Sequence, residues 1–407
     1  MMKGIVAYKA RGTKSGVVLS RCFAGITEDY TATTFEQAVS FLTEQFPNSI
    51  SVCWGLYNFS DTIFSLLPKS TQKEIETKAR LHVGNVKIFH TRKFLGITVT
   101  DKIKDNFYSI AENNFYGISH WFPFDNRIPD TVQEIEQLGE ELLNGLDKLD
   151  IQTNKLTSPI GVFLNDIDTE GLPTIYNLNP YCLQAMDYAD QVAGYEWRNE
   201  YSKRKLKTIY QYDLTSAYPS FIRDLPNTSC GTVKHSNEWV ECDWGIVKST
   251  LETTAKVIPV NKNAKYFTTE EIEWVEEHKL GKFTIEDGWY FSFDKSRPYQ
   301  ALVEGLLKER KSKDKIVSTL AKKIAQGLSG KLDQYNSDLS YGELYNPILA
   351  LMVRSRCRLK VGNFIYDNGL QDDVVKVLVD SVYTTKQVDI PSKSLPGIFR
   401  EIMQRGK

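Results

Sequence analysis

The chain has 407 residues, which is enough for two or three domains with at least one sizeable core. It is 41% hydrophobic and 25% charged with a net charge of −1, so it lacks the strongly basic balance of many nucleic-acid-binding proteins. None of its six cysteines forms a Cys-x-x-Cys pair, which argues against a zinc ribbon and a disulfide scaffold and favours a reducing compartment such as the cytoplasm. No apolar run approaches the ~18 residues of a membrane span, and no signal peptide is evident, so no membrane partner is expected.

The first half of the chain mixes strand and helix patterns that are typical of an α/β domain. Strand-like segments lie at 4–10, 49–57 and 85–90, a helical pattern lies at 34–46, and one long amphipathic helix is predicted over 130–149. Residues 155–200 show no regular pattern. We therefore expect a domain boundary near residue 200.

The second half begins with a strand and a turn. A strand-rich segment then runs to about residue 292. The remaining predicted elements are two helices at 298–311 and 315–331, a helix at 346–366, and a hairpin within 374–386.

Two aspartates lie where apolar strands stop. In "IYQYDLTSAYPS" (209–220), Tyr210 and Tyr212 share one strand face, and Asp213 follows at the strand end, before Pro219 marks the exit. In "DVVKVLVDSVYTTK" (373–386), two β-branched arms flank Asp380 and Ser381, so we expect an acid at the tip of a tight hairpin. Each acid alone is also typical of an Asx turn.

Taken together, these acids favour a metal site. A buried carboxylate is costly unless a cation or donor compensates it, and two acids at two strand ends suggest one shared divalent ion. Mg²⁺ suits such a site because it needs only one or two carboxylates plus substrate phosphates.

The helix predicted at 315–331 has a cationic side. The apolar residues Ile316, Leu320, Ile324 and Leu328 form a core stripe, and the opposite face gathers Lys315, Lys322, Gln326 and Ser329. The preceding helix carries Arg310 and Lys311. This pair of helices could clamp a triphosphate, although a lysine face is also typical of an ordinary solvated helix.

The order of acid strand, lysine helix and acid hairpin resembles the family B DNA polymerases. "DLTSAYPS" resembles their motif A, "LAKKIAQGLSGKL" their motif B and "VLVDSVYTT" their motif C. The segments "DLPNTSCG", 266–291 and "YNPILALMVRSRCRLKV" look like the same regions of the protein-primed phage and linear-plasmid branch. The resemblance is specific over about 205–400 and weak over 1–200.

The resemblance implies a role for each matching residue. Asp213 and Asp380 would hold the metal, Mg²⁺ with Mn²⁺ as a substitute, and the main chain at Leu214 would cradle the triphosphate. Tyr218 matches the tyrosine that stacks under the sugar and excludes a 2′-hydroxyl. The phosphates would meet Lys322 and Arg310, Gln326 would lie beside the nucleotide, and the primer-template would meet Ser381 and Lys331.

This sequence also departs from the family. Leu378 stands where the first motif C aspartate is expected, and Gln326-Gly327-Leu328-Ser329 replaces the Asn-Ser-x-Tyr of motif B. Between Lys331 and Asn346 there is room only for a short connector, without the branch's insertion, and a full thumb is not recognised. We therefore expect distributive synthesis, or an accessory subunit or terminal protein that replaces the thumb.

The first domain should resemble a 3′–5′ exonuclease that has lost proofreading. Its first strand, "IVAYKARG", lacks the expected Asp-x-Glu. Asp61 in "YNFSDTIFSLL" matches the second exonuclease motif, whereas Asp147 offers only a poor match to the third. One acid would not hold two metals.

We therefore expect an α/β (α+β) protein with an RNase H-like exonuclease-type domain at 1–200 and a polymerase domain at 201–407. The latter divides into a palm (201–297 and 334–407) and helical fingers (298–333), with the thumb absent or reduced. The expected activity is template-directed DNA synthesis from dNTPs on primer-template DNA, in a cytoplasm that is a host's if the gene is viral or plasmid-borne. Two alternatives remain: a primase/polymerase with relaxed sugar selectivity, and a non-catalytic nucleic-acid-binding subunit.

Overall fold

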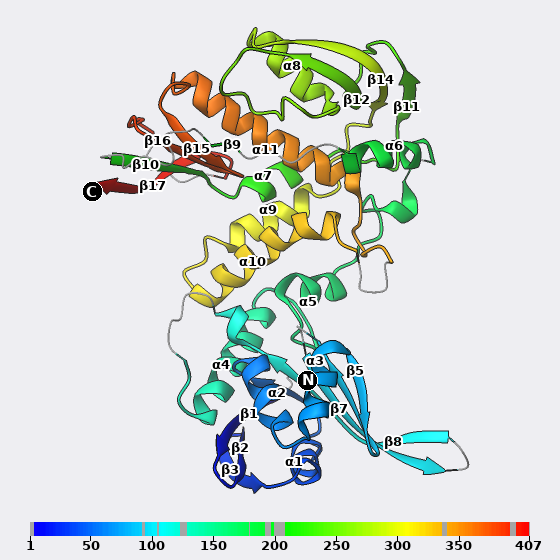
Figure 1. Cartoon of the computed structure of the whole chain (residues 1–407), viewed down its shortest axis with the longest axis vertical. Helices are drawn as coiled ribbons and strands as arrows, with labels where there is room; N and C mark the ends of the chain where they lie inside the picture. The colour runs from blue at the N-terminus through cyan, green and yellow to red at the C-terminus, as the bar shows by residue number, and fades with distance from the viewer. Residues whose placement is uncertain are drawn as a thin grey trace. The chain divides into compact units, whose positions relative to one another are not determined.

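The computed structural model describes residues 4–91, 94–103, 106–122, 128–178, 180–191, 197–198, 208–335, 340–390 and 396–406. These residues form a mixed α/β structure with one large sheet and two smaller ones (Figure 1), which confirms the predicted fold class. Contacts divide the chain into two compact units. Unit 1 comprises Met1–Asp168 and Glu309–Ile324, and unit 2 comprises Thr169–Lys308 and Ala325–Lys407. The predicted functional domains, 1–200 and 201–407, have different limits and stay a prediction.

Unit 1 is built on a mixed sheet of eight strands among the described residues, in the order β3-β2-β1-β4-β8-β7-β6-β5. Only the pairs β1–β4 and β4–β8 are parallel. The strands are β1 (Gly4–Thr13), β2 (Gly16–Phe23), β3 (Ile26–Ala32), β4 (Ser49–Cys53), β5 (Arg80–Val83), β6 (Val86–His90), β7 (Phe94–Ile103) and β8 (Asn106–Gly117). The helices are α1 (Phe35–Leu42), α2 (Leu56–Phe64), α3 (Lys69–Thr77), α4 (Val132–Asp147) and α5 (Pro159–Asp166), with a 3₁₀ turn η1 (Ser119–Trp121).

Helices cover both faces of this sheet, as the alternation in β1 requires. Val6 and Tyr8 point into a core that α1 and α2 close. Ile5 points the other way, toward α4, where Gly139 leaves the space that its methyl groups fill. Because successive strand residues face opposite sides, a strand that is apolar at every position must be buried on both.

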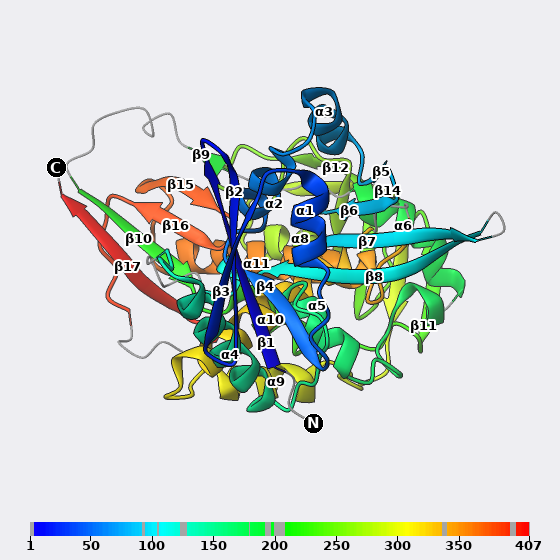
Figure 2. The same cartoon turned by 90° about the horizontal axis from the view of Figure 1, so that it is seen from below.

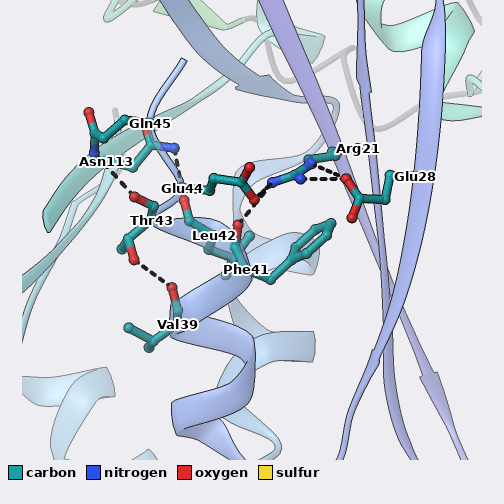
Figure 3. A network of polar contacts seen from close by, with 9 residues as sticks. All are labelled: Arg21, Glu28, Val39, Phe41, Leu42, Thr43, Glu44, Gln45 and Asn113. Carbon is teal, nitrogen blue, oxygen red and sulfur yellow. Dashed lines mark hydrogen bonds and ion pairs between the residues drawn. The ribbon is translucent and has the colours of Figure 1, made fainter. Parts of the chain in front are cut away.

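The end of α1 is held by side chains from three other segments (Figure 3). The last carbonyls of a helix lack partners within the helix. Here the amide of Asn113 donates to Leu42 O at 2.9 Å, and Gln45 donates to Thr43 O at 3.2 Å. Arg21 forms ion pairs with Glu44 (2.6 Å) and Glu28 and lies over the Phe41 ring, so a buried cation sits at the negative end of the helix dipole.

Unit 2 contains two antiparallel sheets among its described strands. The first has the order β17-β10-β16-β15-β9 and the second β11-β14-β12-β13. The strands of the first are β9 (Trp197–Arg198), β10 (Thr208–Leu214), β15 (Val374–Leu378), β16 (Ser381–Thr384) and β17 (Phe399–Gly406). The strands of the second are β11 (Thr232–Ser236), β12 (Trp244–Glu252), β13 (Tyr266–Thr268) and β14 (Lys282–Ser292).

The helices of unit 2 are α6 (Pro180–Gln191), α7 (Ala217–Ile222), α8 (Thr269–Glu277) and α11 (Pro347–Asp367), with a 3₁₀ turn η2 (Ile175–Asn177). Helix α9 (Gln300–Glu309) lies in unit 2 except for its last residue. Helix α10 (Lys315–Leu332) begins in unit 1 and ends in unit 2. The sequence therefore predicted helices α9 and α10 within two residues of their observed ends.

Two predictions of local structure are wrong. The strand expected over 49–57 stops at Cys53, and residues 56–64 form α2, because its apolar residues recur at a helical spacing. The segment 155–200, expected to be irregular, contains α5 and α6. Ser158 caps α5 by accepting from Gly161 N, and Pro159 follows in the first turn, a helix start that sequence inspection overlooked.

Helix α11 lies between the two sheets of unit 2 (Figure 1). Cys357, Val361 and Phe364 pack on the five-stranded sheet, whereas Leu359 packs in the core of the four-stranded sheet and α8. A helix that contacts apolar cores on several sides carries apolar residues around most of its circumference, so α11 lacks the one-sided apolar stripe of a surface helix.

Three arginines of α11, Arg354, Arg356 and Arg358, form ion pairs. Arg358, which is nearly buried, binds Glu271 on α8, and Glu271 also accepts from Thr268 N at 2.9 Å in a capping box. Arg354 pairs with Asp333 in a more exposed position. The buried pair therefore joins α11 to the start of α8.

Replacing Arg358 with alanine should lower the free energy of unfolding by about 3–5 kcal/mol, because Glu271 would stay buried without its cation. The matched control on the same helix is Arg354→Ala, which should cost about 0.2–1 kcal/mol. Urea denaturation of both variants measures the difference. Equal losses in the two variants would contradict the role given to the buried pair.

Candidate active site

Asp213 lies on β10, a strand of the five-stranded sheet that has a neighbouring strand on each side. Strand β10 pairs with β16 on one side and β17 on the other (Figure 2), with Ser381 and Arg400 directly opposite Asp213. Residues opposite each other in neighbouring strands point to the same face. The Ser381 hydroxyl donates to Asp213 Oδ1 at 2.7 Å, and Arg400 Nη2 lies 3.7 Å from Asp213 Oδ2.

The hairpin β15–β16 brings the second acid to this row. Leu378 pairs with Ser381, so the two turn residues are Val379 and Asp380. The predicted tip, Asp380-Ser381, is therefore shifted by one residue, because Ser381 already belongs to β16. The backbone carbonyl of Asp380 accepts from Leu214 N at 3.0 Å, which ties the tip to the end of β10 beside Asp213.

The turn carries backbone strain at the site. Val379 has a φ of 53°, in the left-handed region that a β-branched residue rarely adopts. Such a conformation costs of order 1–3 kcal/mol and persists only where the surroundings impose it. Here the two paired strands and the bond from Leu214 to Asp380 hold the turn in place.

The two carboxylates repel each other. Burial and the charge of Asp213 raise the pKa of Asp380 above its ordinary value. Behind them, burial and the two acids raise the pKa of Cys357 on α11 to about 12. Burial is also the main reason that the pKa of Tyr218 rises to about 12. Tyr218 and Cys357 are therefore neutral at pH 7, so the buried side of the site does not compensate the carboxylates, and the cation described beside them is Arg400, on the exposed side.

This arrangement fits a divalent cation. Two like charges held together by the backbone become favourable when a cation lies between them. Across the residues that the structure describes, no three His, Cys, Asp or Glu side chains gather in one place, so the candidate site has two carboxylates. That number suits Mg²⁺, whose remaining ligands are commonly water and substrate phosphate. Asp213 and Asp380 are the residues that would hold it.

The chain turns sharply after Asp213. The amide of Leu214 is used by Asp380 O and that of Thr215 by Ile398 O at 3.0 Å, so neither is directed at a ligand in this structure. Ser216 adopts a left-handed conformation (φ 51°) and α7 follows. Tyr218 lies in the first turn of α7, against the core formed by β10 and α11. The role predicted for the Leu214 main chain, in cradling a triphosphate, stays a prediction.

The structure leaves the cationic helix untested as part of this site. Arg310 and Lys322 belong to unit 1, whereas the two carboxylates belong to unit 2. Gln326 and Lys331 lie on the part of α10 in unit 2, with Gln326 exposed. Their predicted contacts with nucleotide and primer-template stay predictions.

The exonuclease prediction also remains open. Asp61 is exposed on α2, and its charge acts on His90, whose pKa is lowered mainly by burial. Asp147 ends α4 and accepts from Gln152 at 3.0 Å. Proofreading, or its loss, therefore stays a prediction.

Sequence reasoning missed two residues of the site, Arg400 and Cys357. Arg400 is adjacent to Asp213 only because β17 pairs with β10, a contact that spans nearly half the chain and leaves no local signal. Cys357 could have been suspected, since it lies in the apolar run of α11.

No helix among the described residues has the length and apolarity that crossing a bilayer requires.

The fold is similar to that of a solved DNA polymerase. Comparison with solved structures finds phi29 DNA polymerase, with a TM-score of 0.69 and 13% sequence identity over 99% of this chain and 85% of that one. Phi29 DNA polymerase complexed with primer-template DNA and incoming nucleotide substrates gives a TM-score of 0.65 and 12% identity, covering 98% of this chain and 84% of that one. No family model and no curated protein matches the chain. The likeness is therefore one of fold, and it confirms the fold expected from the three motifs.

The repulsion within the site predicts a pH-dependent gain in stability for Asp380→Asn. The pKa of Asp380 is higher in the folded state than in the unfolded state. Above the folded-state pKa the ionised Asp380 therefore lowers the stability of the fold, and below the unfolded pKa of about 3.9 this loss disappears. Without metal at pH 7, Asp380→Asn should therefore have a higher Tm than the wild type, and the difference should vanish as the pH falls toward 4. Asp372→Asn, an exposed neighbour, is the control and should show no such trend. A Tm gain that does not depend on pH would contradict the electrostatic cause.

Proposed function

We propose that this chain is a template-directed DNA polymerase of the family B type that adds deoxynucleotides to a primer 3′-hydroxyl. The observation that carries the proposal is the adjacency of Asp213 and Asp380, joined through Leu214 and Ser381, in a polymerase-like fold. Asp213 at the end of β10 and Asp380 in the adjoining β15–β16 turn would supply the paired carboxylates that metal-assisted nucleotidyl transfer uses.

The proposed partners are primer-template DNA and deoxynucleoside triphosphates. The phi29 polymerase of the same fold is complexed with primer-template DNA and incoming nucleotides in one structure and with primer-template DNA in another. The net charge of −1 does not oppose this, because a groove can be positive on a nearly neutral protein. Cytoplasmic location and a viral or plasmid origin belong to the same proposal.

Each site residue has a proposed task. Asp213 and Asp380 would hold Mg²⁺, which supplies activation of the attacking oxygen and stabilisation of the leaving one. Ser381 keeps the Asp213 carboxylate in one orientation through its 2.7 Å hydrogen bond. Lys322 and Arg310 would bind the triphosphate as fixed cations, which favours the charge that develops during phosphoryl transfer.

The residues around the nucleotide would set selectivity and position. Tyr218 is proposed to lie under the sugar and to exclude a 2′-hydroxyl. Gln326 would lie beside the base pair, and Lys331 with Ser381 beside the primer-template. We further propose that synthesis is distributive and that an accessory subunit or terminal protein is a partner that adds phosphate contacts, because such contacts supply most non-specific affinity for duplex DNA.

Asp213→Asn and Asp380→Asn should each reduce Mg²⁺-dependent primer extension by at least about 10³-fold, since either change removes a charge from a site with two carboxylates. Extension of a labelled primer with Mg²⁺ and with Mn²⁺ is the measurement. Asp372→Asn changes a nearby exposed acid and should extend normally. Retained extension in both site variants would refute the proposal.

Tyr218→Ala should relax the preference for dNTPs over NTPs by about tenfold or more, because the ring would no longer exclude the 2′-hydroxyl. Tyr218→Phe keeps the ring and is the matched control, with the preference retained. Single-nucleotide incorporation with each triphosphate, with and without a primer, measures both this role and the alternative of a primase/polymerase with relaxed sugar selectivity. Equal use of dNTPs and NTPs by the wild type would favour that alternative.

One observation favours a non-catalytic nucleic-acid-binding subunit as the second candidate. Leu378 pairs with Ser381, so an apolar side chain occupies the row where the family resemblance expects an aspartate. Template binding without any metal-dependent binding of triphosphate would support this candidate over the first.

A further inference from the structure

The row of side chains around Asp213 ends in a cation that neither the motifs nor the fold comparison assigns. Across four strands the register places Arg400 on β17, Asp213 on β10, Ser381 on β16 and Leu378 on β15 next to one another. The row therefore reads cation, carboxylate, hydroxyl, apolar. The family resemblance expects an acid of motif C at Leu378, so the acid of this row is Asp213 of motif A, with the Arg400 guanidinium beside it.

Each oxygen of Asp213 has its own neighbour. Oδ1 accepts the hydrogen bond from Ser381, and Oδ2 faces Arg400 Nη2 at 3.7 Å. The Arg400 side chain is 45% exposed and that of Asp213 21%, so the pair lies at the solvent-facing side of the site. A distance of 3.7 Å is that of an ion pair without a close hydrogen bond. The guanidinium is therefore held loosely, by a long ion pair at an exposed position.

The other arginines close to the site are engaged elsewhere. Arg358 binds the buried Glu271 and Arg354 binds Asp333, so the charge of each is compensated by its own partner. Tyr218 and Cys357 are neutral at pH 7, since their pKa values are raised to about 12. The ion pair described for the two aspartates of the site is that of Asp213 with Arg400.

A divalent ion and this guanidinium would compete for the same oxygen. An exposed ion pair shifts an equilibrium by about fivefold at most, so a divalent cation between two carboxylates would displace it. A guanidinium that stays within a few ångströms of that cation would repel it. The two are therefore alternative counter-charges for Asp213.

We propose that Arg400 is a positioning residue that occupies Asp213 in the metal-free protein and is displaced when a divalent cation binds. Arg400 thereby weakens metal binding in the absence of nucleotide and keeps the Asp213 carboxylate aligned with its row. Once displaced, the exposed side chain is free to face the phosphates that arrive with the metal. This inference rests on the proposed function, because it takes Asp213 and Asp380 as metal ligands.

The test is titration of the nucleotide-free protein with MnCl₂ by isothermal calorimetry. Arg400→Gln should bind Mn²⁺ about two- to fivefold more tightly than the wild type, because the competing cation is gone. Arg400→Met, which keeps the apolar stem, should show the same gain and replaces the first variant if that one fails to fold. Arg400→Lys keeps the charge and should stay close to the wild type. Arg223→Gln, which removes an exposed arginine paired with Asp224, is the control and should leave the affinity unchanged.

Unchanged or weaker Mn²⁺ binding in Arg400→Gln and Arg400→Met overturns the inference, as does the absence of Mn²⁺ binding in every variant. Primer extension by the wild type, measured on the same preparation, tests the proposed function separately. If the wild type extends primers and the Arg400 variants bind Mn²⁺ no more tightly, the inference fails and the function stands. If the wild type does not extend primers but the variants bind Mn²⁺ more tightly, the function fails and the competition at Asp213 stands.

Discussion

The candidate site depends on a forced approach of two like charges. Pairing of β10 with β16 and the hydrogen bond from Leu214 N to Asp380 O place two carboxylates side by side, although their repulsion and burial oppose it. The energy for this comes from the backbone hydrogen bonds of the sheet and the core beneath it. Two acids held in this way fit a cation between them, and the strained turn at Val379 belongs to the same arrangement.

Helix α11 makes that arrangement rigid. It packs on the five-stranded sheet through Cys357, Val361 and Phe364 and on the four-stranded sheet's core through Leu359. Its start is fixed by Asn346, which caps the helix and also donates to Pro173 O at 3.1 Å. The buried pair of Arg358 with Glu271 then joins it to α8. Because interiors are close-packed, the helix transmits the position of one sheet to the other.

Unit 1 is also held together by an apolar core between its sheet and the helices that cover it. Its sheet is covered on both faces, and Arg21 with its two glutamates secures the end of α1 at the sheet's edge (Figure 3). The acids that an exonuclease resemblance draws attention to, Asp61 and Asp147, lie on α2 and at the end of α4.

Much of the secondary structure and both central acids could be predicted from the sequence alone. Strand β10 with Asp213 at its end, the hairpin with Asp380, and helices α4, α9, α10 and α11 all follow from local periodicity and turn chemistry. The motif resemblance also predicted a polymerase-like fold. These features can be predicted because each depends on residues that lie a few positions apart in the sequence.

The tertiary structure alone decided what lies beside those acids. The pairing of β17 with β10 puts Arg400 opposite Asp213, and the register of β15 with β16 moves the turn to Val379-Asp380 and puts Leu378 in the row of Asp213. The contact of Cys357 with the back of the site needs α11 to pack on that sheet. Strand order and register depend on how whole faces of the sheet pack against the rest of the fold. Strand β10 and the strands that pair with it lie far apart in the sequence, so no short segment contains both partners.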